Sequence, residues 1–251
     1  MSSFPFLDHP GPIPFAHRGG ASEAPENTLP AFQHAVDLGF TYLETDVHAT
    51  ADGVLVAFHD DRLDRVTDQR GLIGELPWSQ VSRARVGGTE PIPLLEDVLG
   101  TWPEVRVNID PKADESVPPL IETIRRTDAV DRVCVGAFSD ERIARVRDAF
   151  DGRLCTGMGP DEMVDLIRAF QGHDVTFRSA AAQIPPVDPK GRPLATPELI
   201  DTAHAHGIAV HVWTIDDPDE MRALLDVGVD GIMTDRPATL REVFEERGIW
   251  H

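Results

Sequence analysis

Apolar residues in this chain fall into short continuous runs that alternate with longer segments in which they recur every three or four positions. The short runs, rich in β-branched residues, are typical of buried strands. This pattern predicts strands over Ile13–Ala16, Thr41–Val47, Val105–Ile109, Arg132–Ala137, Arg153–Thr156, Ala180–Ile184, Ile208–Trp213 and Gly231–Met233.

The longer segments between these runs are typical of amphipathic helices. They predict helices over Thr28–Leu38, Ser116–Thr127, Asp140–Phe150, Pro160–Phe170, Thr196–His206, Pro218–Val227 and Pro237–Arg247. Most of them begin with Ser, Thr, Asp or Pro, residue types that suit the first helical turn.

Several joints between a helix and the next strand share one pattern. D-L-G-F-T-Y-L-E-T-D at 37–46 resembles D-V-G-V-D-G-I-M-T-D at 226–235, and A-H-G-I-A-V-H-V at 205–212 is a third copy. In each, a glycine can end the helix in the left-handed conformation before an apolar strand begins. Eight strands alternating with helices predict an α/β fold, a (β/α)8 TIM barrel. A doubly wound open sheet is the alternative, but no G-x-G-x-x-G follows the first strand.

One segment breaks this alternation. Residues 60–93 carry turn signals and only short helical pieces, so we expect an insertion after the second strand region of a single domain spanning residues 1–251. Loops that follow barrel strands lie at the end where active sites form. The insertion is therefore either a contributor to the substrate site or a long structural loop.

The charge of the chain limits its partners. The formal net charge is −20, which argues against nucleic acid and anionic membranes as partners. The N-terminus lacks the features of a signal peptide, and no apolar run is long enough to span a bilayer. Cys134 and Cys155 lie in apolar runs and are expected to be reduced core thiols. We expect a cytoplasmic protein, and the sequence leaves its oligomeric state open.

Candidate chemistry lies where the predicted strands end. His17 and Arg18 follow the first strand, and alternation places Glu44 and Asp46 on one face of the second. Two carboxylates on one face of a buried strand need a cation between them. A divalent ion such as Mg²⁺ or Ca²⁺ is one answer, and a pair of salt bridges to arginines is the other.

Three further residues extend this set. His59 ends the apolar run V-L-V-A-F that follows a hairpin-type turn, Asp110 lies at the end of the third barrel strand, and Lys112 follows two residues later. Carboxylates, histidines and cations at one barrel end suit a metal-assisted attack on a phosphate ester, in which cations offset the charge and histidines move protons.

The sequence resembles the glycerophosphodiester phosphodiesterase family over almost its whole length. The matching motifs are H-R-G at 17–19, P-E-N-T at 25–28, E-T-D at 44–46, D-G-V-L-V at 52–56, H-D at 59–60, I-P-x-L-E-D-V-L at 92–99, V-W-T at 212–214 and D-G-I-x-T-D-x-P at 230–237. The resemblance implies a TIM barrel that hydrolyses small-molecule glycerophosphodiesters to an alcohol and sn-glycerol 3-phosphate with a divalent cation.

The resemblance also implies residue roles. His17 and His59 match the acid and base, Glu44 and Asp46 match metal ligands, and Arg18 and Lys112 match phosphate contacts. Asp110 matches a third ligand, although family members commonly carry glutamate there. Trp213 is expected either to form an apolar wall of the substrate site or to pack in the core, and Phe138 either lines the pocket or belongs to the core.

Two alternatives to this function remain. One is a lysophospholipase-D-like enzyme, for which Leu72, Ile73, Leu76 and Trp78 of the insertion could form an apolar rim. The other is a non-catalytic barrel that binds phosphorylated ligands, which the presence of both His17 and His59 disfavours.

Overall fold

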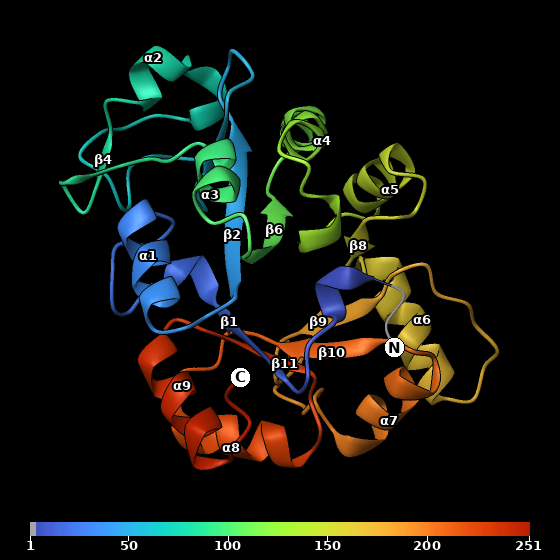
Figure 1. The fold of residues 1–251 in the computed structure, drawn as a ribbon. Helices are drawn as coiled ribbons and strands as arrows, with labels where there is room; N and C mark the ends of the chain where they lie inside the picture. Colours follow the sequence, from blue (N-terminus) through green and yellow to red (C-terminus); the bar gives the residue numbers. More distant parts are fainter. Residues whose placement is uncertain (1–3) are drawn as a thin grey trace.

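The computed structural model describes residues 4–251, and its central feature is a barrel of eight parallel strands (Figure 1). Neighbouring strands follow the order β8-β7-β6-β2-β1-β11-β10-β9. A parallel bridge between Gly157, just after β8, and Ala181 of β9 brings the two ends of this path together. The strands are β1 (Ile13–Ala16), β2 (Tyr42–Ala49), β6 (Arg106–Pro111), β7 (Val133–Val135), β8 (Cys155–Thr156), β9 (Ala181–Ile184), β10 (Ala209–Val212) and β11 (Gly231–Thr234). The predicted TIM barrel is confirmed.

Helices follow the strands and surround the barrel (Figure 1). They are α1 (Leu29–Asp37), α3 (Leu95–Thr101), α4 (Val117–Arg126), α5 (Asp140–Ala149), α6 (Pro160–Phe170), α7 (Pro197–Ala205), α8 (Pro218–Asp226) and α9 (Pro237–Glu246). The seven predicted helices are present, each within about one residue of its expected bounds. The sequence did not predict α3, a short helix whose N-terminus has no side-chain cap.

The register between β2 and β6 brings the candidate carboxylates together. Asp46 is the partner of Asp110, and Glu44 is the partner of Asn108. Side chains alternate between the two faces of a strand, so all four point into the barrel. Tyr42 shares this face and belongs to the apolar cluster inside the barrel, whereas Leu43 packs outward in the main core.

The inner cluster fills the end of the barrel where the strands begin. Phe6, from the short helix η1 (Pro5–Leu7), packs against Phe15 and Tyr42, and the Tyr42 hydroxyl donates to the Phe6 carbonyl at 2.7 Å. Cys134 and Cys155 belong to the same cluster and are free thiols, as the sequence predicts. Side chains pack this end of the barrel, and a cavity opens where the strands finish.

The insertion follows β3 (Leu55–Ala57), which forms a hairpin with β2. It contains η3 (Ile73–Glu75), α2 (Trp78–Val81), β4 (Arg85–Val86) and β5 (Glu90–Pro91). Figure 1 shows α2 and β4 beside the barrel, on the side of α1 and α3. The insertion has a small core of its own, made of Val56, Phe58, Leu63, Ile73, Val81, Ala84, Val86 and Ile92.

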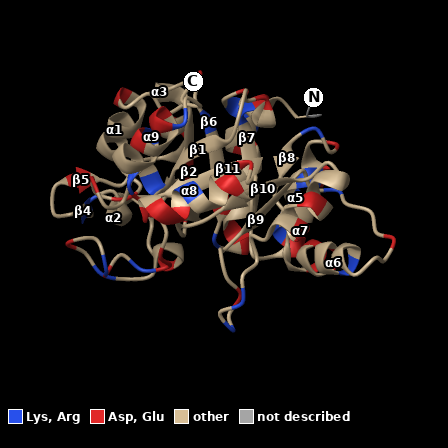
Figure 2. Cartoon of the chain, turned by 90° about the horizontal axis from the view of Figure 1, so that it is seen from below, with Lys and Arg blue, Asp and Glu red and all other residues tan. Residues whose placement is uncertain are grey.

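Acidic residues are spread over the outer helices and loops, with basic residues between them (Figure 2). None of the helices in residues 4–251 is both long and apolar enough to cross a membrane. The N-terminal stretch in which no signal peptide is predicted begins with Met1–Ser3, and these three residues lie outside the described part of the chain.

Candidate active site at the carboxyl end of the barrel

His17 lies in a tight turn directly after β1. The turn, η2 (His17–Gly19), needs left-handed backbone at Arg18, Gly19 and Gly20, with φ values of 51°, 79° and 100°. A Cβ on Gly19 would come within 2.8 Å of Ala31 in α1, so only glycine fits there. The first helix therefore packs closely against the turn that carries the histidine.

Asp235 fixes the orientation of His17. The Nδ1 atom of His17 lies 2.6 Å from the Asp235 carboxylate and donates to it, because an ionised carboxylate only accepts. Nε2 is left facing the cavity, 3.7 Å from Glu44. Burial lowers the pKa of His17, but the charge of Glu44 and the hydrogen bond to Asp235 outweigh it, and the net shift is upward.

Glu44 and Asp46 are buried side by side, and their pKa values shift in opposite directions. Burial and the charge of Asp46 raise the pKa of Glu44 to about 7. Burial also acts on Asp46, but Lys112 and Arg18 outweigh it and lower the pKa of that carboxyl. A buried carboxylate whose pKa is raised in this way is short of positive charge, which is the condition that a bound cation relieves.

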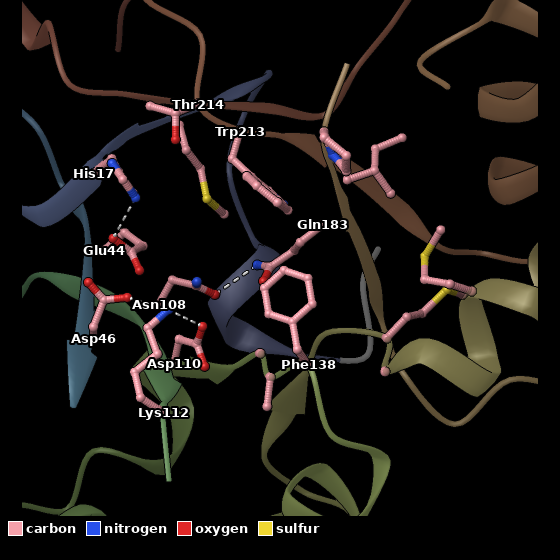
Figure 3. Close-up of a pocket in the computed structure, with 18 of the residues that line it drawn as sticks. His17, Glu44, Asp46, Asn108, Asp110, Lys112, Phe138, Gln183, Trp213 and Thr214 are labelled. Carbon is pink, nitrogen blue, oxygen red and sulfur yellow. Dashed lines mark hydrogen bonds and ion pairs between the residues drawn. The ribbon is translucent and has the colours of Figure 1, made fainter. Parts of the chain in front are cut away.

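Lys112 lies between Asp46 and Asp110. Its Nζ atom is 2.8 Å from the Asp46 carboxylate and 2.6 Å from that of Asp110 (Figure 3). β6 continues to Pro111, beyond the predicted strand end at Ile109, and this extension holds Lys112 beside the second strand. Burial raises the pKa of Asp110 despite the attraction of Lys112.

His59 follows β3 and reaches the same cavity as His17. Its Nδ1 atom donates to Asp60 at 2.6 Å, which leaves Nε2 free for a substrate. His48 Nε2 lies 3.0 Å from the His59 carbonyl and fixes the backbone there. His17 and His59 thus share one arrangement, in which a carboxylate accepts a hydrogen bond from Nδ1 of the ring.

Arg18 has several acidic neighbours, but one of its side-chain nitrogens lacks a hydrogen bond. Its backbone N–H donates to Glu44 at 3.1 Å and its Nη1 to Glu26 at 3.2 Å. Its Nε lies 3.1 Å from Asp46 as an ion pair, yet it is buried without a hydrogen bond of acceptable alignment. A donor in this state is available to an anionic ligand in the cavity.

The cavity has a volume of about 470 Å³ and two chemically different sides (Figure 3). Charged residues from β1, β2, β6 and the end of β3 line one side. Residues from β7 to β11, the loops that follow them and α6 line the other side, which is mostly apolar: Phe138, Met158, Met163, Ile184, Pro185, Leu194, Trp213 and Met233. Phe138 and Trp213 meet edge to face at 5.8 Å between ring centres.

All nine predicted site residues line this cavity, namely His17, His59, Glu44, Asp46, Asp110, Arg18, Lys112, Trp213 and Phe138. Phe138 is 73% exposed, so it is not a core residue. No residue of the insertion at 60–93 lines the cavity. The insertion reaches the site only indirectly, through side chains behind the cavity wall.

The donor chemistry of the carboxylates fits a hard divalent cation, since Glu44, Asp46 and Asp110 offer only oxygen. As placed in residues 4–251, however, no three acidic, histidine or cysteine side chains form a group that could hold a metal. Lys112 lies between Asp46 and Asp110 and supplies the positive charge there. Glu44, Asp46 and Asp110 thus present oxygen donors to the cavity, and two of them are paired with Lys112.

Sequence analysis missed several residues that support the site. Asp235 lies in the recognised D-G-I-x-T-D motif, but nothing in its spacing indicates contact with His17. Asn27, in the P-E-N-T motif, donates to Asp46 at 3.2 Å, while Thr28 caps α1. Gln183 donates to Asn108 at 2.8 Å across the barrel. These contacts join residues far apart in the chain and depend on barrel closure.

Comparisons with known proteins identify the family of this chain. The model of the glycerophosphoryl diester phosphodiesterase family matches residues 17–239. The chain is 40% identical to a probable glycerophosphodiester phosphodiesterase 2 of Mycobacterium tuberculosis, over 98% of this chain and 95% of the relative. It is 30% identical to lysophospholipase D GDPD1 of Rattus norvegicus, over 90% and 84% of the two chains.

Solved structures share the fold. A putative glycerophosphoryl diester phosphodiesterase from Silicibacter pomeroyi superposes with a TM-score of 0.82 at 23% identity, over 99% of this chain and 100% of the other. An Oleispira antarctica phosphodiesterase, in complex with the product sn-glycerol-3-phosphate, superposes with a TM-score of 0.80 at 22% identity, over 94% and 97%. With the family match over most of its length, this chain belongs to the glycerophosphoryl diester phosphodiesterase family.

Proposed function

We propose that the chain carries out the reaction of its family, hydrolysis of glycerophosphodiesters to an alcohol and sn-glycerol 3-phosphate, with a divalent cation, Mg²⁺ or Ca²⁺. One observation carries the proposal: two histidines, each held through Nδ1 by a carboxylate, line a cavity together with three carboxylates, an arginine and a lysine. The product bound to the Oleispira relative is the expected product here.

The histidines supply the proton transfers. The attacking oxygen, from water or from the substrate's own glycerol hydroxyl, loses its proton to Nε2 of one histidine as its bond to phosphorus forms. Nε2 of the other histidine protonates the leaving oxygen as the bond between phosphorus and the alcohol breaks. Attack by the glycerol hydroxyl gives a cyclic phosphate, which water must then open to release sn-glycerol 3-phosphate. Because Asp235 and Asp60 accept from the Nδ1 atoms, each ring keeps the tautomer that exposes Nε2 to the cavity.

The cations of the site bind the phosphate. Arg18 offers an unsatisfied Nε, and Lys112 can turn from its carboxylates toward an anion. Glu44, Asp46 and Asp110 would hold the divalent cation. When bound, this ion supplies charge neutralisation and polarisation of a phosphoryl oxygen.

The test is incubation of the purified protein with glycerophosphocholine and Mg²⁺ or Ca²⁺, followed by measurement of sn-glycerol 3-phosphate. We expect the wild-type protein to release sn-glycerol 3-phosphate. Chelator should abolish this release, and the His17→Ala substitution should reduce it at least 100-fold. Failure to release it from any glycerophosphodiester would contradict the function. If chelator leaves the release unchanged, the proposed requirement for a divalent cation is contradicted. Full activity of the His17→Ala variant would contradict the proposed mechanism.

A second candidate substrate class is the lysophospholipids, and the apolar side of the cavity favours it. Met163 and Leu194 line this side together with the exposed Phe138. A substrate with only a small polar head group would leave these apolar side chains in contact with water, whereas an acyl chain would cover them. The rat relative is named lysophospholipase D. None of the four residues expected to form an apolar rim, Leu72, Ile73, Leu76 and Trp78, lines the cavity. Ile73 is fully buried, and Leu76 and Trp78 pack against the insertion's own core.

A further inference from the structure

Arg65 is a residue of the insertion whose guanidinium group joins two carboxylates from different parts of the chain. Its Nε and Nη2 donate to Asp60 at 2.6 and 3.0 Å. Its Nη1 and Nη2 donate to Glu26 at 2.8 and 2.7 Å. Each carboxylate is bound by two guanidinium nitrogens, a planar arrangement that fixes both partners in distance and in orientation.

Each of these carboxylates in turn holds a residue of the phosphate site. Asp60 accepts from His59 at 2.6 Å, and Glu26 accepts from Arg18 at 3.2 Å. Arg65 itself does not line the cavity. It therefore lies behind the wall of the cavity, at the point where the supports of a proton-transfer residue and a phosphate-binding residue meet.

The backbone that carries Arg65 is held in place on both sides. Leu63 is buried in the core of the insertion, and its N–H donates to the Gly71 carbonyl at 3.0 Å. The Thr67 hydroxyl and N–H both donate to the Leu63 carbonyl, at 2.8 and 3.1 Å. Fixing the backbone reduces the entropy that a half-exposed arginine loses when it makes four hydrogen bonds.

The charges agree with this arrangement. The hydrogen bond from Arg65 is the largest influence on Asp60 and, with His59, lowers the pKa of that carboxyl to about 2. Asp60 thus stays ionised as an acceptor for His59 over the whole working pH range. Arg65 also places a second positive charge beside Glu26, whose carboxylate pairs with both Arg65 and Arg18.

We propose that Arg65 is a positioning residue, which sets the spacing between His59 and Arg18 through Asp60 and Glu26 and so makes the insertion part of the catalytic unit. The proposal rests on the proposed function of the site. Loss of such a support displaces both the phosphate and a proton-transfer histidine, and costs roughly 10- to 100-fold in activity.

The test compares Arg65→Ala with the matched control Arg62→Ala. Arg62 lies on the same loop and is similarly exposed, but its ion pair, with Asp64, does not involve the supports of the site. With glycerophosphocholine, Arg65→Ala is expected to lower kcat and raise KM, giving a loss in kcat/KM of roughly 10- to 100-fold. Arg62→Ala is expected to stay within about twofold of wild type, in line with an exposed pair of small energetic weight.

Further variants separate positioning from simple loss of folding. Glu26→Gln, which frees Arg18, should act mainly on KM, and Asp60→Asn, which frees His59, mainly on kcat. Guanidinium ion at millimolar concentration should restore part of the activity that Arg65→Ala loses. It should leave the activity of Arg62→Ala unchanged. Arg65→Lys should recover thermal stability but only part of kcat/KM, because one ammonium group cannot reproduce four hydrogen bonds.

The outcomes are distinct. An Arg65→Ala protein whose Tm falls while kcat per folded molecule and KM stay at wild-type values would overturn the proposal. Calorimetric binding of sn-glycerol 3-phosphate gives a second readout that needs no turnover, and Arg65→Ala should weaken it through Arg18. Equal affinity in both proteins would also overturn the proposal, whereas an inactive wild type would count against the proposed function instead.

Discussion

The carboxylate of Asp235 holds the Nδ1 atom of His17 at 2.6 Å, although 218 residues separate the two in sequence. The contact exists because β1 pairs in parallel with β11, with Ala16 opposite Thr234, so the residues after both strand ends meet. His17 thus depends on both ends of the chain.

Asp235→Asn is expected to lower kcat by about 100-fold with a smaller change in KM. The amide can donate where the carboxylate only accepts, so the ring loses its single tautomer. Steady-state kinetics with glycerophosphocholine measures the effect. Asp217→Asn is the control, because Asp217 caps α8 through its side chain. Equal losses in both variants would contradict a role for the Asp235 contact.

Cation affinity should fall as the pH is lowered through 7. The pKa of Glu44 is raised to about 7, and its proton must leave before the carboxylate binds a metal. Below this value the apparent affinity should drop by up to about tenfold per pH unit, and binding should release a proton. Calorimetry with Mg²⁺ or Ca²⁺ at pH 6 and pH 8, in buffers of different ionisation enthalpy, measures both. Equal affinity at the two pH values would contradict the link.

Lys112→Met should reduce the free energy of unfolding of the metal-free protein by about 3 kcal/mol. The change leaves Asp46 and Asp110 without their shared cation. Added Mg²⁺ or Ca²⁺ should recover more stability in the variant than in wild type, since metal then replaces the missing charge. Urea unfolding with and without metal tests this. A variant that metal does not stabilise would argue against a cation between these carboxylates.

His211 should make the fold less stable as the pH falls. Its imidazole is fully buried beside Phe15, neither ring nitrogen has a hydrogen-bond partner, and burial lowers its pKa from 6.5 to about 4 despite the attraction of Asp230. Above pH 6.5 the imidazole is neutral in both the folded and the unfolded state and does not reduce stability. As the pH falls from 6.5 to about 4, the free energy of unfolding decreases by up to about 3 kcal/mol, because only the unfolded state readily takes up the proton.

Urea unfolding of wild type, His211→Leu and His173→Gln between pH 4 and pH 8 measures this effect. The leucine variant should lose less stability across the window, because no buried imidazole remains to be protonated. His173 is exposed, so its variant should follow wild type. If the free energy of unfolding of wild type and of His211→Leu changes with pH in parallel, His211 does not contribute to the loss of stability at low pH.

The apolar side of the cavity should distinguish lipid-like from small substrates. Met163→Gln and Phe138→Ser should lower kcat/KM for lysophosphatidylcholine about tenfold or more, while that for glycerophosphocholine stays within about twofold, because only the acyl chain needs the apolar surface. Equal effects on both substrates, or no activity of wild type on lysophosphatidylcholine, would exclude the lysophospholipid class.

The sequence predicts the barrel and the residues at its strand ends because both depend on local pattern. Alternation in L-E-T-D and N-I-D places Glu44, Asp46 and Asp110 on inward faces, and the β2–β6 register confirms it. The roles of Asp235 and Arg65 were not predictable in this way. Their contacts depend on how the barrel closes and how the insertion folds back, and neither follows from periodicity.

Barrel closure also sets when this protein can begin to work. β11 pairs directly with β1, and the residue after it completes the support of His17. During synthesis, every metal-ligand candidate and both histidines leave the ribosome well before that last strand. The nascent chain therefore lacks the carboxylate that orients His17 until its C-terminal strand docks.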